Sequence, residues 1–273
     1  MIDANLAPDT PPNPAANPSA TPSPHPVLAA RALRRAYGST LALDGVDLDI
    51  RAGESVAIMG PSGSGKSTLL HTLAGIERPD SGSVLLAGPG TAPRDITALG
   101  EGERSRLRRE SFGFVFQSGL LIPELTAAEN VAMALMINGV PRAAALPRAA
   151  QWLAALGLAG LEERRIGQLS GGQAQRVAIA RAQVTGARVT FADEPTGALD
   201  SATGAEVLAV LMDSTTGRGN TLVMVTHDAD VAARCDRIIR LRDGRIIAEH
   251  TAPPAAANPA TASSAIANPG RAY

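Results

Sequence analysis

The sequence predicts an α/β fold that carries one mostly helical insert. Over residues 27–250, short apolar strands alternate with helices, which is the pattern of an α/β domain. An apolar strand over residues 54–59 leads into a glycine-rich loop and a helix start, and a second one over residues 189–192 is followed by two carboxylates. Between them, residues 118–185 show mainly the 3.6-residue period of helices. We therefore expect an α/β body interrupted by a helical region.

The strands of the body are short and bounded by turn residues. They are expected over residues 27–37, 41–50, 54–59, 189–192, 221–225 and 237–250. The last segment contains the dipeptide Asp243-Gly244, which favours a hairpin turn. A helix should begin at Gly65, directly after the glycine-rich loop. The body thus begins and ends with strands.

The helical region begins with a clear start signal. Thr126 is followed three residues later by Glu129, a pair that satisfies the free N–H groups of a helix terminus. Residues 143–158 and 170–183 continue the helical period. We expect consecutive helices here with few strands between them.

Composition limits the class of protein and its location. A formal charge of −1 argues against an extended basic face, so we expect no nucleic-acid partner. The single cysteine, Cys235, fits a reducing compartment, and the first thirty residues lack the basic and apolar parts of a secretory signal. No apolar run approaches the ~20 residues that span a bilayer. We expect a cytoplasmic protein with two disordered tails, residues 1–26 and 251–273, that are rich in Pro and Ala.

The glycine-rich loop contains the only lysine in the chain. Its residues are Gly60, Pro61, Ser62, Gly63, Ser64, Gly65, Lys66, Ser67 and Thr68. The pattern G-x-x-x-x-G-K-[ST] between a strand and a helix predicts a phosphate-binding loop. Glycines allow successive N–H groups to point at one anion, Lys66 would bridge the β- and γ-phosphates, and Ser67 would hold Mg²⁺. The alternative is a glycine turn with a solvated lysine.

Two adjacent carboxylates supply the chemistry that a phosphate loop needs. Asp193 follows an apolar strand and would hold the metal ion, while Glu194, one residue further, would face the γ-phosphate. Hydrolysis requires a base within hydrogen-bond reach of the attacking water, and Glu194 can serve. The alternative is an exposed acidic pair at a strand end.

Further motifs occur in a fixed order along the chain. Residues 169–173 have the sequence LSGGQ. The other motif residues are Tyr37, Gln117 of FVFQ, Leu199, Asp200 and His227 of VTHD. With the phosphate loop and ADEPTG, they make residues 27–250 resemble the nucleotide-binding subunit of ATP-binding cassette (ABC) transporters. The resemblance implies a P-loop NTPase core with a mixed sheet, an antiparallel β subdomain and an inserted helical subdomain, the ABC ATPase fold.

The resemblance also implies cofactors and residue roles. ATP and Mg²⁺ are the expected cofactors. Tyr37 would stack on the adenine, Gln117 would touch the Mg²⁺ and γ-phosphate region, and His227 would donate a hydrogen bond to the γ-phosphate. Each residue also has an alternative interpretation without a role in ATP binding. Tyr37 could be an ordinary strand residue, Gln117 a loop amide and His227 a histidine at the end of a strand. Gln183 and Thr190 are polar at positions where apolar residues are expected.

The signature residues imply a second copy of the chain. Ser170, Gly171, Gly172 and Gln173 would open a helix, and their N–H groups would form an anion cradle with no phosphate of its own. The family pairs two subunits head to tail around two ATP molecules. Asp200 would communicate across this dimer interface.

Residues 96–131 suggest a branch of the family. They resemble the lipoprotein-release, macrolide-efflux and cell-division branch, whose membrane partners are FtsX-like permeases on separate chains. The implied function is an ATPase subunit, peripheral on the inner face of the membrane, that drives such a permease. The charged residues of 101–110 are expected to form a solvated helix face, with partner contact as the alternative.

Two other functions are compatible with the family. The same ATP-driven dimer could switch a cell-wall hydrolase through its membrane partner without transporting anything, and the sequence does not separate this from transport. A soluble ABC ATPase of DNA repair or translation would carry a long coiled-coil insertion or two tandem cassettes. Neither feature is present in this sequence.

Overall fold

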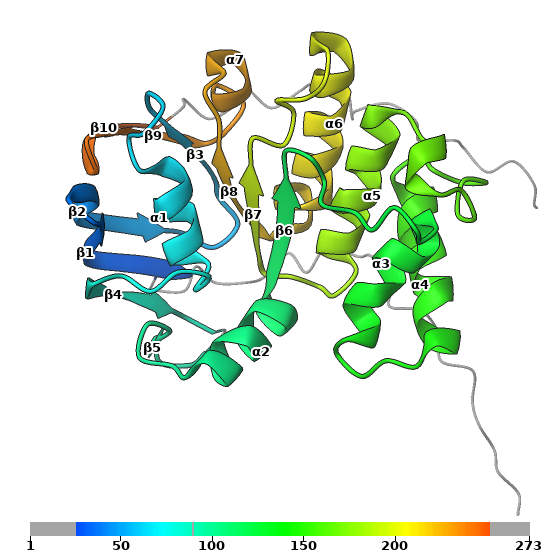
Figure 1. The fold of residues 1–273 in the computed structure, drawn as a ribbon, viewed down its shortest axis with the longest axis horizontal. Coiled ribbons are helices and arrows are strands. Elements are labelled where there is room, and N and C mark those ends of the chain that lie inside the picture. The colour runs from blue at the N-terminus through cyan, green and yellow to red at the C-terminus, as the bar shows by residue number, and fades with distance from the viewer. Residues whose placement is uncertain (1–25, 89, 252–273) are drawn as a thin grey trace, which may run out of the picture.

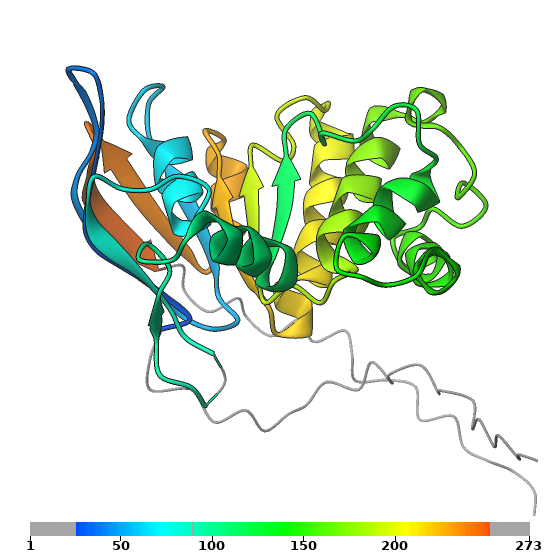
Figure 2. The same ribbon diagram turned by 60° about the horizontal axis from the view of Figure 1, so that its bottom comes forward.

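The structure is a computed structural model that describes residues 26–88 and 90–251. The predicted disordered tails lie almost entirely outside these residues. Figure 1 shows an antiparallel sheet with α1 at one end, a parallel sheet in the middle, and α3, α4 and α5 at the other end. The view in Figure 2 shows α2 in front of the parallel sheet, on the side away from α6.

The strands form two sheets. The first has the order β2-β1-β4-β5 and its pairings are all antiparallel. The second has the order β10-β9-β3-β8-β7-β6, in which only the edge pair β10-β9 is antiparallel. The strands are β1 (Leu28–Tyr37), β2 (Thr40–Ile50), β3 (Ser55–Met59), β4 (Ser81–Leu86), β5 (Arg94–Asp95), β6 (Phe112–Phe116), β7 (Val189–Asp193), β8 (Thr221–Val225), β9 (Arg237–Arg242) and β10 (Arg245–Thr251).

The helices fall mainly into two groups. One lies beside the sheets and the other forms the helical region after β6. The helices are α1 (Lys66–Leu73), α2 (Glu101–Ser111), α3 (Ala127–Met136), α4 (Arg142–Ala155), η1 (Ile166–Gln168), α5 (Gly171–Gln183), α6 (Ser201–Ser214), η2 (Thr216–Arg218) and α7 (Ala229–Ala232). None of those between residues 26 and 251 has both the length and the apolar character to cross a lipid bilayer. The mixed sheet, the antiparallel sheet and the helices confirm the predicted fold class.

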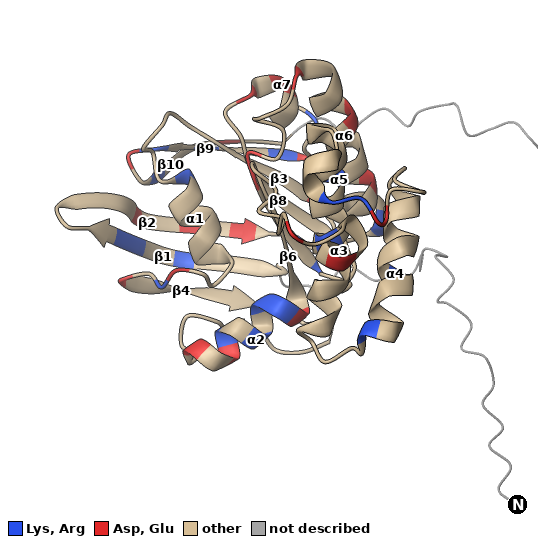
Figure 3. Cartoon of the chain, turned by 45° about the vertical axis from the view of Figure 1, so that its right-hand side comes forward, with Lys and Arg blue, Asp and Glu red and all other residues tan. Residues whose placement is uncertain are grey.

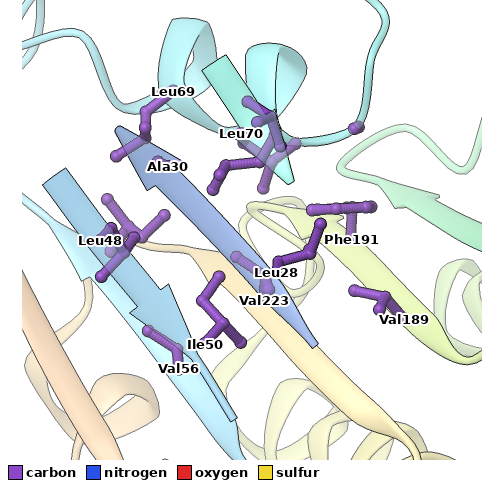
Figure 4. Close-up of a cluster of buried hydrophobic side chains, with 14 of the residues drawn as sticks. Leu28, Ala30, Leu48, Ile50, Val56, Leu69, Leu70, Val189, Phe191 and Val223 are labelled. Carbon is purple, nitrogen blue, oxygen red and sulfur yellow. The ribbon is translucent and has the colours of Figure 1, made fainter. Parts of the chain in front are cut away.

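The central strands are buried on both faces, and this explains their unbroken apolar sequences. In β7, Val189 and Phe191 belong to one core while Ala192 belongs to the other. Figure 4 shows the first core, in which side chains from β1 and β2 meet Leu69 and Leu70 of α1 and reach across to Phe191. The second core lies between the other face of the sheet and the helices α3 to α6. The central strands of the sheet are therefore packed on both faces.

Local signals in the sequence predict several element boundaries correctly. Thr126 caps α3, since its hydroxyl accepts the N–H of Glu129 at 3.2 Å and the Glu129 carboxylate accepts the N–H of Thr126 at 3.0 Å. The β9–β10 hairpin turns at Asp243 and Gly244, both with positive φ, as the Asp-Gly dipeptide predicts. These signals are short-range, so they can be read without knowing the fold.

The prediction of a fully solvated charged face on residues 101–110 is wrong for Arg104. Figure 3 shows basic and acidic residues alternating along α2. Arg104 is nevertheless only 6% exposed, and it pairs with Glu101. Arg108 also reaches Glu101 and donates to the carbonyl oxygen of Gly75 at 2.6 Å. The helix α2 thus uses its arginines to attach to the body, a tertiary contact that periodicity does not reveal.

The helical region is joined to the body by an aromatic contact. The guanidinium carbon of Arg218 in η2 lies 4.6 Å from the ring centroid of Trp152 in α4. Such a cation–π pair is typically worth about 0.5–2 kcal/mol, depending on how far it is removed from water. Trp152 is the only tryptophan of the chain. Its ring therefore lies where the helical region meets the residues after α6.

The two unexpected polar residues of the core hydrogen-bond to each other. The Gln183 side chain donates from Nε2 to Oγ1 of Thr190 at 2.9 Å, and both residues are buried. We predict that Gln183→Leu lowers the free energy of unfolding by about 1–3 kcal/mol, because it leaves the buried Thr190 hydroxyl without its donor. The double variant Gln183→Leu/Thr190→Val should recover most of this loss. Urea unfolding measures both, and losses that simply add in the double variant would contradict the pairing.

Candidate functional site

The glycine-rich loop packs closely against the backbone of β9 on one side and of β2 on the other. A methyl group built on Gly60 would lie 2.1 Å from the carbonyl oxygen of Leu241 in β9. One built on Gly65 would lie 2.1 Å from the carbonyl oxygen of Ala42 in β2. No side chain fits at either position, and Gly65 also has a φ of 98° directly before α1. The path of the loop is therefore imposed by its neighbours on both sides.

The polar groups of this loop fit a bound phosphate. Lys66 donates from Nζ to the carbonyl oxygen of Pro61 at 2.9 Å, so its ammonium lies over the loop. The Ser64 hydroxyl is buried and has no hydrogen-bond partner among the described residues. The first N–H groups of α1 have no acceptor within the helix, and the helix dipole favours negative charge there. An anion in the loop would satisfy these groups.

Asp193 lies at the end of β7, next to the loop. Burial raises the pKa of its carboxyl group, while the charge of His71 and a hydrogen bond from Ser67 oppose the rise. The hydroxyl of Ser67, the carboxylate of Asp193 and the amide oxygen of Gln117 are hard oxygen donors of the kind that Mg²⁺ prefers. The set of donors therefore fits the magnesium ion that the sequence predicts.

Glu194 and His227 are in direct contact. The Nδ1 atom of His227 lies 2.9 Å from both carboxylate oxygens of Glu194. The His227 side chain is 72% exposed and that of Glu194 is 20% exposed. The hydrogen bond with Glu194, followed by the attraction of its charge, raises the pKa of His227. Glu194 also has a φ of 48°, which is unfavourable for a residue with a side chain.

A cleft of about 510 Å³ joins most of the predicted catalytic and metal residues. It is lined by Ser67, Phe116, Gln117, Ser118, Leu120, Asp193, Glu194 and Ala198. Ser67, Gln117, Asp193 and Glu194 come from three separate segments, and the fold brings them together. Of the other four, Phe116 belongs to the FVFQ motif, whereas Ser118, Leu120 and Ala198 could have been indicated only by their nearness in sequence to predicted residues.

Tyr37 does not line this cleft. It is 44% exposed at the end of β1, and its hydroxyl donates to Glu77. The guanidinium carbon of Arg35 lies 4.8 Å from the centre of its ring. The structure thus shows an exposed aromatic ring supported by an arginine and a carboxylate. Stacking on adenine stays a prediction for this residue.

The signature residues lie at the start of α5, and they too are absent from the lining of the cleft. The Ser170 hydroxyl accepts the N–H of Gln173 at 3.3 Å, and Gln173 accepts the N–H of Ser170 at 2.9 Å. A methyl group on Gly172 would lie 2.4 Å from Thr203 of α6. Asp200 caps α6 by accepting the N–H groups of Ala202 and Thr203. The two helix starts therefore lie together.

We predict that His227 titrates above its ordinary pKa of 6.5 and that Glu194→Gln moves it back toward that value, since the neutral amide cannot attract the imidazolium. Proton NMR of the His227 ring measures the shift. The raised pKa means that the ion pair contributes stability below pH 6.5 and loses it as pH rises through the folded value. Because His227 is exposed, this contribution is small. An identical titration in both proteins would exclude the contact in solution.

Comparison with known proteins identifies the family. Residues 43–197 match the sequence profile described as ABC transporter. The chain is 48% identical over 229 residues to the macrolide export ATP-binding/permease protein MacB of Nitrosomonas europaea, which covers 82% of this chain and 34% of that protein. It is 48% identical over 231 residues to the pyoverdine export ATP-binding/permease protein PvdT of Pseudomonas aeruginosa, covering 83% and 34%. The chain thus spans about a third of the length of these curated relatives.

Solved structures agree with this match. The dimeric post-hydrolysis state of the ATP-binding cassette MJ0796, bound to ADP and Pi, is similar with a TM-score of 0.74 and 38% identity, over 83% of this chain and 99% of that one. The structure of cbiO1 from Clostridium perfringens, part of the ABC transporter complex cbiONQ, is similar with a TM-score of 0.73 and 30% identity, over 83% of this chain and 89% of that one. The chain belongs to the ABC transporter family and is its ABC ATPase domain.

Proposed function

We propose that two copies of this domain close head to tail around two ATP molecules, and that hydrolysis lets them separate. The observation that supports this most directly is the position of residues 170–173. At this helix start the N–H groups of Ser170 and Gln173 bond within the cap, whereas those of Gly171 and Gly172 have no acceptor among the described residues. None of these residues lines the cleft that holds Ser67 and Glu194. A γ-phosphate held by a second copy would satisfy the N–H groups of Gly171 and Gly172. The similar cassette MJ0796 has been solved as a dimer.

The residues of the cleft divide the chemistry with Lys66 and His227, which do not line it but adjoin Ser67 and Glu194. Lys66 and the loop N–H groups bind the phosphates, and Ser67, Gln117 and Asp193 hold the Mg²⁺. When bound by these residues, Mg²⁺ would supply positive charge to offset that of the phosphate oxygens. Glu194 accepts the proton of the attacking water, with His227 donating to the γ-phosphate. In this structure His227 hydrogen-bonds to the Glu194 carboxylate. His227 must therefore turn toward the phosphate before Glu194 is free to act as the base.

The proposed domain covers residues 27–250, with its helical insert at about 118–185. We further propose that this domain drives an FtsX-like permease from the inner face of the membrane. The two relatives compared above are named for export, which favours transport over the control of a cell-wall hydrolase. Their names also combine ATP binding and permease in one protein. The contact proposed below is the same whether the permease lies on the same chain or, as the sequence resemblance suggests, on a separate one.

An apolar groove offers a docking site for this permease. It has a volume of about 450 Å³ and lies between α2, β6 and α3. Ile76, Phe114, Met133 and Ile137 are among the residues that line it. Ile76 and Ile137 are 39% and 57% exposed and line the same groove, and exposed apolar side chains that gather in one place mark interaction sites. A short apolar segment of the permease would cover these residues.

We predict that Glu194→Gln binds ATP but hydrolyses it at least about 100-fold more slowly, because it lacks the general base. The ATP-bound dimer should then persist on size exclusion in ATP and Mg²⁺, with its mass measured by light scattering. Lys66→Ala, which lacks the phosphate-binding ammonium, is the control and should remain monomeric. A Glu194→Gln protein that binds ATP by calorimetry and stays monomeric would contradict the proposal.

The apolar groove leads to a separate prediction about permease binding. Ile137→Asp should abolish co-purification of an FtsX-like permease, identified by mass spectrometry, because it places a charge in the apolar contact. ATP hydrolysis by the isolated domain should be unchanged. Ile247→Asp is the matched control, since Ile247 is 53% exposed on β10, outside the groove. Equal recovery of the permease with both variants would place the partner elsewhere.

A further inference from the structure

The loop that carries Gln117 is held by side chains of the signature helix α5. Gln175 donates from Nε2 to the carbonyl oxygen of Phe116 at 2.9 Å. Arg181 donates from Nη2 to the carbonyl oxygen of Gly119 and from Nη1 to that of Leu120, both at 2.7 Å. The residues held in this way lie on both sides of Gln117. One helix therefore fixes the turn before and after it.

The conformation of this loop is not one that its sequence prefers. Leu120 has a φ of 46°, a left-handed conformation that side chains other than glycine disfavour. Its own side chain is 58% exposed, so packing of that side chain does not hold the turn. Instead, the guanidinium of Arg181 holds the turn by donating to the carbonyl groups of Gly119 and Leu120. The strained turn thus depends on a residue about 60 positions away in the chain.

Arg181 is placed unusually for a residue that serves only packing. Burial lowers the pKa of its guanidinium, and its hydrogen-bond acceptors in the structure are neutral carbonyl groups. Arg181 is half-buried, and withdrawing a cation from water without a carboxylate is costly unless its hydrogen bonds are well made. Arg181 also lines the apolar groove, whereas Gln117 lines the cleft. The Arg181 side chain therefore lies between the apolar groove and the cleft.

We propose that Arg181, assisted by Gln175, is a positioning residue that holds Gln117 in the hydrolysis site and ties it to the signature helix. Neither residue lines the cleft, so both act through the loop. The start of α5 is the proposed contact to the second ATP. A shift of α5 when two copies close would move the Gln117 loop with it. This inference rests on the proposed role of Gln117.

The experiment measures steady-state hydrolysis of Mg²⁺-ATP by the full chain. Arg181→Met keeps the apolar stem of the side chain and removes both donors. We expect kcat to fall by about 10-fold to 100-fold, the effect of misplacing a catalytic group by up to about 1 Å, with KM within about twofold. Arg181→Lys, which keeps the charge but loses the two-pronged fork, should recover part of the rate.

The matched control is Arg176→Met on the same helix. Arg176 binds Glu206 of α6 at 2.7 Å instead of the loop, so its loss should leave kcat unchanged. Thermal unfolding of each variant measures any loss of fold. Should Arg181→Met fold poorly, Gln175→Leu removes only the bond to Phe116 and should lower kcat in the same way. An equal fall in kcat for Arg176→Met would overturn the proposal.

A double variant tests whether Arg181 acts through Gln117. If it does, Gln117→Ala/Arg181→Met should be no slower than Gln117→Ala alone. Losses that multiply would show an independent role and overturn the inference. If Gln117→Ala itself hydrolyses ATP at the normal rate, the proposed role of Gln117 fails and the inference with it. If Gln117→Ala is slow but Arg181→Met is normal, only the positioning role fails.

Discussion

The site depends on one constraint, which is that the central strands of the mixed sheet are parallel and buried on both faces. Parallel strands all end at the same edge, so the segments that follow them meet there. The phosphate loop follows β3, Gln117 follows β6 and Glu194 follows β7, and Val225 at the end of β8 precedes Thr226 and His227. Four polar segments that are distant in sequence thus converge at one edge, because the four strands that precede them run parallel.

The same constraint explains why strain collects at this edge. Among the described residues with positive φ, Leu120 and Glu194 both line the cleft. A backbone held in such a conformation requires support from its surroundings. For Glu194 the N–H bonds to the carbonyl oxygen of Val225 at 3.0 Å, and for Leu120 the support comes from Arg181. The sheet edge gives a rigid base on which unfavourable turns can be maintained.

The sequence predicts the fold class and those parts of the site that are contiguous. The phosphate loop, the Asp193-Glu194 pair and the Thr126 cap are each specified by a few adjacent residues, and the structure places them as local chemistry requires. Contacts between distant segments are not predictable in this way. The bond between Gln183 and Thr190, the burial of Arg104 and the bonds from Arg181 to the carbonyl groups of Gly119 and Leu120 each depend on segments that share no motif. Only the packing of α5 and α2 against the sheet brings them together.

The contact between Trp152 and Arg218 has a practical consequence. Indole emission is sensitive to nearby charge and to water, and this protein has one indole, located where the helical region meets the body. Rotation of that region would change the distance between ring and guanidinium. The fluorescence of Trp152 would therefore report a movement of the helical region relative to the body, without any attached dye.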